Sequence, residues 1–152
     1  MRYVRQGKET DFDEIRQVIS SAIRQCITDS DEHYEFLYSN VCSNLDWWIE
    51  NRDRALLLVS VQGDSILGMV FVREFWNLTA LFVDPKQHRL GVGCDLVTSV
   101  INSCKHRSPK GCLQLNSSNY AAAFYRKMGF VQTGNAINKP GGCIPFKLMF
   151  NA

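Results

Sequence analysis

The hydrophobic pattern of the first fifty residues predicts one short strand followed by two amphipathic helices. From about residue 11, apolar side chains recur every three or four positions, the period of one helical face: Phe12, Ile15, Val18, Ile19, Ala22 and Ile23. Thr10 or Asp11 is suited to cap this helix. Residues 32–50 repeat the spacing in a segment rich in Tyr, Phe and Trp, and residues 2–5 form a short strand before both.

The middle of the chain predicts three strands in succession. Residues 55–61 and 66–73 are apolar runs, and Gly63 and Asp64 lie in the polar stretch between them, as expected of a hairpin turn. A third run, residues 78–83, ends before Pro85, which has no N–H to donate to a strand ladder. We expect these three strands to form the centre of a sheet.

After residue 90 the pattern alternates between helix and strand. An apolar helical face follows Gly93, residues 112–116 form a strand, and residues 119–128 form a helix that ends at Gly129. Two further strands, at residues 130–133 and 144–150, close the chain. Strand-helix-strand order requires at least one parallel pairing, so the sequence predicts an α/β fold with a mixed sheet.

Composition places this fold in one soluble domain spanning residues 1–152. The chain has 45% hydrophobic and 21% charged residues, and its formal net charge of +2 gives no reason to expect a nucleic-acid partner. Charged residues stand at the N-terminus where a signal peptide needs an apolar run, and no apolar stretch approaches a membrane span. The six cysteines include no C-x-x-C pair and no zinc-site spacing. We therefore expect a cytoplasmic protein without a metal.

The segment from residue 78 to residue 104 carries the first chemical signal. A strand runs into a loop that contains Gly91 and Gly93, and a helix follows directly. The start of a helix offers unpaired N–H donors and a partial positive charge, which suit a diphosphate, and Lys86, His88 and Arg89 add donors nearby. The alternative is a simple tight turn, because the loop lacks the Gly-Lys-Ser/Thr of a Walker loop and the third glycine of a dinucleotide fingerprint.

A second motif, about one strand and one helix further on, gives this loop a context. It runs Phe124-Tyr125-Arg126-Lys127-Met128-Gly129-Phe130. Together with Val83-Asp84-Pro85 and Gly91-Val92-Gly93, this motif resembles the Gcn5-related N-acetyltransferases (the GNAT family). The resemblance is strong over residues 78–130 and architectural over residues 1–77. His88 occupies the position where the family usually has Arg or Gln, a departure that bears on cofactor affinity.

The resemblance implies a GNAT fold, a mixed but mostly antiparallel sheet of about six or seven strands flanked by about four helices. It also implies acetyl-CoA as co-substrate, with the pantetheine arm lying between splayed fourth and fifth strands. The residues that would hold the cofactor are Leu81, Phe82 and Val83 along the arm, His88, Arg89, Leu90, Gly91, Val92, Gly93 and Cys94 at the pyrophosphate, and Asn116, Asn119 and Phe124 beside them.

The same resemblance suggests catalytic roles. Tyr125 is the candidate general acid for the leaving thiolate, and its alternative role is that of a half-buried helix aromatic. Glu74, at the end of the predicted strand over residues 66–73, is the candidate base, with Glu32, His33 and Asp46 as weaker ones. The acceptor is a small-molecule amine or a protein amino group, and a homodimer is the family expectation. Two other functions remain open: a non-catalytic acyl-CoA sensor, and a toxin-type acetyltransferase acting on aminoacyl-tRNA.

Overall fold

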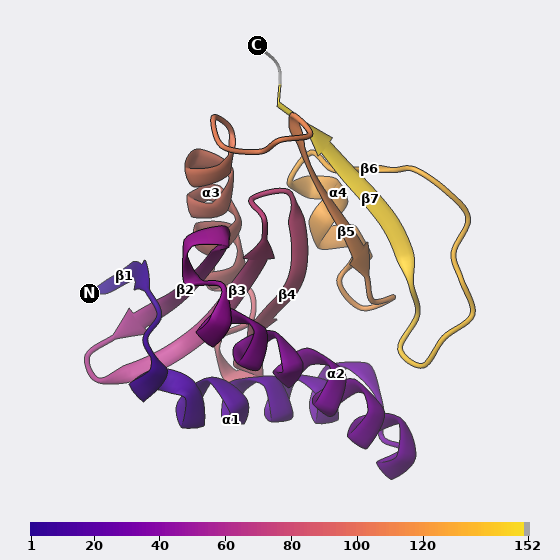
Figure 1. Ribbon diagram of the computed structural model, residues 1–152. Helices are drawn as coiled ribbons and strands as arrows, with labels where there is room; N and C mark the ends of the chain where they lie inside the picture. The colour runs from indigo at the N-terminus through magenta and orange to yellow at the C-terminus, as the bar shows by residue number, and fades with distance from the viewer. Residues whose placement is uncertain (151–152) are drawn as a thin grey trace.

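One sheet with the strand order β1-β2-β3-β4-β5-β7-β6 organises the computed structural model, which describes residues 1–150 (Figure 1). The strands are β1 (Arg2–Gln6), β2 (Ala55–Gln62), β3 (Ser65–Arg73), β4 (Asn77–Val83), β5 (Cys112–Ser117), β6 (Val131–Gln132) and β7 (Ile144–Met149). The α-helices are α1 (Phe12–Ala22), α2 (Asp31–Glu50), α3 (Val92–Cys104) and α4 (Ala122–Lys127). A π-helical turn, η2 (Ile23–Ile27), extends α1.

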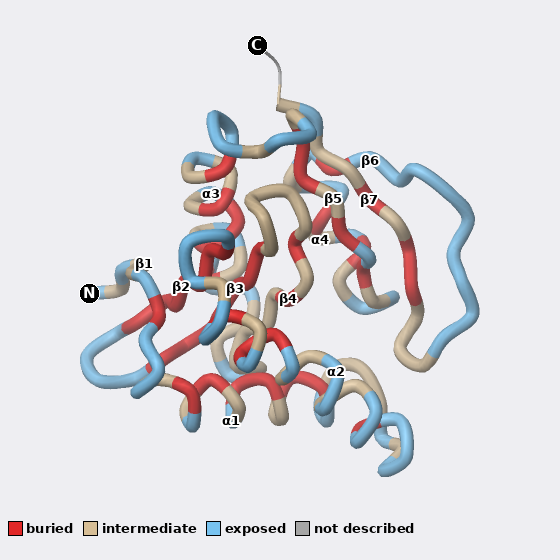
Figure 2. Tube along the Cα trace, in the orientation of Figure 1, coloured by how far each residue is buried: buried red, intermediate tan, exposed pale blue. Residues whose placement is uncertain are grey.

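The two faces of the sheet build two separate apolar cores. Side chains alternate across a strand, so Leu56 and Leu58 of β2 pack toward α3 and α4, whereas Leu57 and Val59 pack toward α1 and α2. Both faces of the central strands are therefore buried (Figure 2). This explains why β2 and β3 are continuous apolar runs in the sequence rather than alternating ones.

The junction between β4 and β5 departs from regular pairing. Every other pair of neighbouring strands is antiparallel, but β4 and β5 run parallel and are matched only at Asn77 with Gln114 and at Leu78 with Leu115. Directly beyond this contact, Thr79 forms a bulge against β3, because Leu78 and Ala80 oppose adjacent β3 residues. The rest of β4 therefore pairs with no strand on its β5 side.

The predicted α/β architecture, with a mixed sheet of about seven strands and four helices, is confirmed. The main local difference is the last helix, which begins at Ala122 rather than at residue 119. The N–H of Asn119 donates to the Gly141 carbonyl, and Ser118 accepts from the N–H of Ala121, so these residues form a turn before the helix. No helix within residues 1–150 is long and apolar enough to cross a membrane.

Candidate active site

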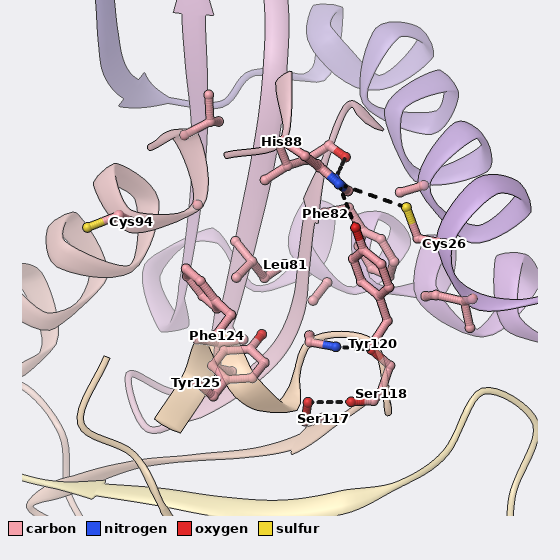
Figure 3. A pocket seen from close by; sticks show the side chains of 18 of the residues that line it. Cys26, Leu81, Phe82, His88, Cys94, Ser117, Ser118, Tyr120, Phe124 and Tyr125 are labelled. Atoms are coloured by element: carbon pink, nitrogen blue, oxygen red, sulfur yellow. Dashed lines mark hydrogen bonds between the residues drawn. The ribbon is translucent and has the colours of Figure 1, made fainter. Parts of the chain in front are cut away.

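A cavity of about 450 Å³ opens where β4 and β5 diverge (Figure 3). Its walls come from β4, the end of β5, the loop between β4 and α3, the start of α4, and the end of α1 with η2. This volume is within the range of small-molecule sites. The cavity thus joins the two segments that carry the sequence motifs, although nearly thirty residues of helix and strand separate them in the chain.

The unpaired side of β4 presents backbone groups to this cavity. The N–H of Asp84 donates to the Leu67 carbonyl at 2.8 Å, which shows that Asp84 faces β3. Backbone groups point to alternate sides along a strand, so Phe82 also bonds toward β3, while Leu81 and Val83 point away from it. All three line the cavity, but only Leu81 and Val83 turn backbone groups toward it, and the Val83 carbonyl among these is already in contact with His88 Nε2.

The loop between β4 and α3 brings the beginning of a helix to the open end of the cavity. Gly91 has a positive φ of 88° and precedes α3, whose first residues receive no side-chain cap. The first N–H groups of α3 are therefore free of side-chain acceptors. Arg2 fixes this loop from β1, because it donates to the Leu90 carbonyl at 2.8 Å and pairs with Asp95 of α3 at 3.0 Å.

Most of the predicted loop residues line the cavity. The lining includes His88, Arg89, Gly91, Val92, Gly93 and Cys94, whereas Leu90 is more than half exposed and lies outside it. Gly93 has a steric reason to be glycine, since a Cβ there would lie 3.3 Å from the ring of Phe124. Phe124 also lines the cavity, and it closes the space between α3 and α4.

The other wall includes residues that sequence reasoning did not select. Asn116 lines the cavity, but Asn119 does not, because its side chain packs against Gly142 in the loop before β7. Ser117, Ser118 and Tyr120 line the cavity in its place. Only their position beside Asn116 pointed to them, and no motif distinguishes them from other turn residues.

Tyr125 lies in the cavity wall with its ring held by other aromatic residues. The rings of Phe124, Phe130 and Phe146 stand 5.3, 5.6 and 6.2 Å away, and only 5% of Tyr125 is exposed. The hydroxyl points into the cavity (Figure 3). Burial raises the pKa of this phenol well above its ordinary value, so the group keeps its proton at neutral pH.

Glu74 lies away from the cavity, contrary to the position expected from the sequence. It follows β3 in a tight turn with a positive φ of 55°, and its carboxylate pairs with Arg54. This turn is next to the end of β4 that is still paired with β5. The weaker candidates Glu32, His33 and Asp46 are exposed on α2 and do not line the cavity.

His88 turns its side chain toward β4 and the cavity. Its Nε2 lies 3.1 Å from the Val83 carbonyl, and its Nδ1 lies 2.9 Å from the Tyr120 hydroxyl. The thiol of Cys26, from η2, is 4.0 Å from the same Nδ1. Within residues 1–150, no group of three or more His, Cys, Asp or Glu side chains is arranged to hold a metal ion.

Comparison with known proteins agrees with this geometry. A family model described as an acetyltransferase (GNAT) domain matches residues 25–147. A GCN5-related N-acetyltransferase from Rhodopseudomonas palustris superposes with a TM-score of 0.82 at 19% identity, covering 98% of this chain and 96% of that one. PaiA N-acetyltransferase from Thermoplasma acidophilum, solved with coenzyme A, gives 0.78 at 16% identity and covers 99% of both chains.

A GNAT family acetyltransferase from Brucella melitensis, solved with acetyl-CoA, gives a TM-score of 0.71 at 19% identity and covers 100% of this chain and 90% of that one. At these identities the solved structures establish a common fold. The chain matches no curated protein.

Proposed function

Because the chain belongs to the acetyltransferase (GNAT) family, we propose that it is an N-acetyltransferase that moves the acetyl group of acetyl-CoA to a primary amine. The observation that carries the proposal is the free edge of β4 inside the cavity, where Leu81 and Val83 present backbone groups that no strand satisfies. A buried backbone edge needs hydrogen-bond partners, and an extended amide-bearing arm supplies them in the manner of an added strand.

The proposed placement of acetyl-CoA follows from this edge. The pantetheine arm lies along β4 and bonds to Leu81 and to the N–H of Val83, and the pyrophosphate lies on the free N–H groups at the start of α3. Arg89 stands at the same end of the cavity and supplies a positive charge for the phosphates. A β4 N–H then polarises the thioester carbonyl, which stabilises negative charge as the amine attacks.

The reaction in this arrangement is one direct displacement. The neutral amine attacks the thioester carbon, the new C–N bond forms, the nitrogen loses one proton to water, and the C–S bond breaks to release the thiolate of coenzyme A. We assign Tyr125 as the acid that protonates this thiolate, because its hydroxyl faces the cavity and carries a proton at neutral pH. Water returns a proton to the Tyr125 phenolate afterwards. The acceptor is a small-molecule amine or a protein amino group.

The cavity lining favours one kind of acceptor. None of the lining residues is Asp, Glu or Lys, and apolar side chains such as Ile27 and Phe82 form the wall nearest α1 and α2. A polycation such as a polyamine would find no carboxylate partner in this lining. We therefore propose a single amine on an apolar or neutral body as the acceptor, in preference to a polyamine.

The test combines binding of acetyl-CoA by calorimetry with release of thiol across a panel of amines. Tyr125→Phe keeps the ring packing and removes the acid, so kcat should fall about 10²-fold or more while acetyl-CoA binding stays the same. Tyr38→Phe, on α2 outside the cavity lining, is the matched control and should keep full turnover. Equal turnover in both variants would remove the acid role, and binding without turnover of any amine would favour an acyl-CoA sensor.

A further inference from the structure

Three elements that are distant in the sequence meet at one edge of the cavity. Cys26 comes from η2, His88 from the loop after β4, and Tyr120 from the loop between β5 and α4 (Figure 3). The Nδ1 of His88 is their common point, 2.9 Å from the Tyr120 hydroxyl and 4.0 Å from the Cys26 sulfur. All three residues line the cavity in which the proposed acetyl transfer takes place.

The contacts of the imidazole define its tautomer. A backbone carbonyl only accepts hydrogen bonds, so the Nε2 atom that lies 3.1 Å from the Val83 carbonyl must carry the hydrogen. In the neutral ring, Nδ1 then has a lone pair, and both of its neighbours can donate to it: the Tyr120 O–H and the Cys26 S–H. The Val83 carbonyl thus holds the ring with its proton-accepting atom toward the cavity.

Among the ionisable side chains that line the cavity, His88 is also the one best suited to accept a proton. The ionisable side chains that line the cavity are those of Cys26, His88, Arg89, Cys94, Tyr120 and Tyr125. An arginine does not deprotonate in a protein, and burial raises the pKa of both phenols, which makes them proton donors at neutral pH. Thiols ordinarily lose their proton near pH 8.5, so His88 is the lining group suited to accept a proton at neutral pH.

We infer that His88 Nδ1 is the general base of the reaction and that the Tyr120 hydroxyl relays the proton to it. This inference rests on the proposed function. The acceptor arrives as an ammonium ion, Tyr120 passes its proton to Nδ1 and takes one from the ammonium, and the ring becomes an imidazolium. The neutral amine then attacks the thioester, and the imidazolium returns its proton to water after each turnover.

The titratable and charged groups near His88 are a phenol, a thiol and two cationic side chains. The groups that face it are Tyr120, Cys26 and the adjacent cationic Arg89, while Lys86 is exposed in the preceding turn. No carboxylate lines the cavity to stabilise an imidazolium.

The experiment compares His88→Gln with His106→Gln, which replaces an exposed histidine beyond the end of α3. The glutamine amide can still donate to the Val83 carbonyl, but it cannot accept a proton. With an alkylamine substrate at pH 7, we expect kcat/KM for the amine to fall about 10²-fold or more in His88→Gln, with the dissociation constant of acetyl-CoA within about threefold of the wild type.

The pH profile separates a base from a structural residue. The deficit of His88→Gln should shrink toward pH 10, where free alkylamine is abundant without a base. Tyr120→Phe should share the deficit at pH 7, and His106→Gln should follow the wild type. A deficit of His88→Gln that is constant across the pH range would overturn the inference, as would full activity at pH 7.

A measurement that needs no turnover supports the kinetics. In ¹⁵N-labelled protein bound to coenzyme A at pH 8, the His88 ring should show the Nε2–H tautomer that the contact with the Val83 carbonyl requires. An Nδ1–H tautomer, or a ring still charged at pH 8, would refute the base role while leaving acetyl transfer intact. Absence of transfer by the wild type to any amine would refute the proposed function itself, and the base role with it.

Discussion

The hydrogen bonds of Asn44 test what stabilises the point where β4 and β5 diverge at the cavity. It is 5% exposed on α2, and its Oδ1 accepts from Arg73 Nε at 3.0 Å and from the Thr79 hydroxyl at 2.8 Å. Arg73 ends β3, and Thr79 is the bulge residue of β4 that lines the cavity. One side-chain oxygen therefore joins α2 to both strands where β4 leaves β5.

Substitution of this residue by alanine should leave two donors without an acceptor. Loss of a neutral hydrogen bond costs about 1 kcal/mol, and loss of a bond from a charged donor costs about 1.5–3 kcal/mol. Burial lowers the pKa of Arg73, which indicates that the guanidinium is partly removed from water. We expect the loss of these contacts in Asn44→Ala to lower the free energy of unfolding by about 2.5–4 kcal/mol, and Tm by about 5–15 °C.

The assay is urea unfolding followed by circular dichroism, with Asn40→Ala as the matched control. Asn40 lies one turn earlier on α2 and is exposed, so this variant receives the same gain in helix propensity without the loss of the buried contacts. The difference between the two variants isolates the contacts to Arg73 and Thr79. If both variants unfold at the same urea concentration, the hydrogen bonds of Asn44 do not stabilise the junction.

Two further predictions concern the cofactor loop and the response to acid. Gly91→Ala should lose about 1 kcal/mol of stability because of its positive φ, and it should also bind acetyl-CoA more weakly. The control Gly63→Ala, equally strained in the β2–β3 turn, should lose stability alone. Equal acetyl-CoA affinity in the two variants would show that the loop at Gly91 does not bind the cofactor. The hydrogen bond from Arg5 holds the pKa of Asp11 below its ordinary value, so the pair stabilises the fold above that value, and the contribution disappears as pH falls through the lowered pKa. Asp11→Asn should accordingly cost about 1 kcal/mol at pH 7 and nothing near pH 2, as measured by urea unfolding; a loss that does not change with pH would exclude the ion pair as its cause.

The sequence predicted the elements whose signals are local. The apolar face of the first helix is buried along its whole length, from Phe12 to Ala22, because a helical period depends only on residues three or four apart. The turn at Gly63 and the strand end at Pro85 likewise depend on backbone chemistry at those residues. The same holds for the glycine loop before α3, which the structure places at the cavity.

Positions that depend on distant contacts escaped prediction. Glu74 was expected to face the cleft because it ends the third strand, but the sequence does not indicate which end of β4 separates from β5. Asn119 turns to the loop at Gly141, more than twenty residues later, and this contact moves its side chain away from the cavity. Contacts between segments distant in sequence decide both positions, and the hydrophobic periodicity of the chain does not predict such contacts.

The departure of His88 from the family pattern has a physical explanation in its contacts. At the position where the resemblance leads one to expect Arg or Gln, the side chain is turned toward Val83, while the free N–H groups at the start of α3 remain available for the phosphates. In the proposed placement of acetyl-CoA, the main chain therefore binds the phosphates without this side chain, and the imidazole serves the acceptor side of the cavity. The substitution His88→Arg should therefore preserve acetyl-CoA binding and lower kcat/KM for the amine at pH 7, since a guanidinium accepts no proton at any pH the fold survives. A variant that binds acetyl-CoA more tightly and turns over amines as fast as the wild type would instead assign this position to the cofactor.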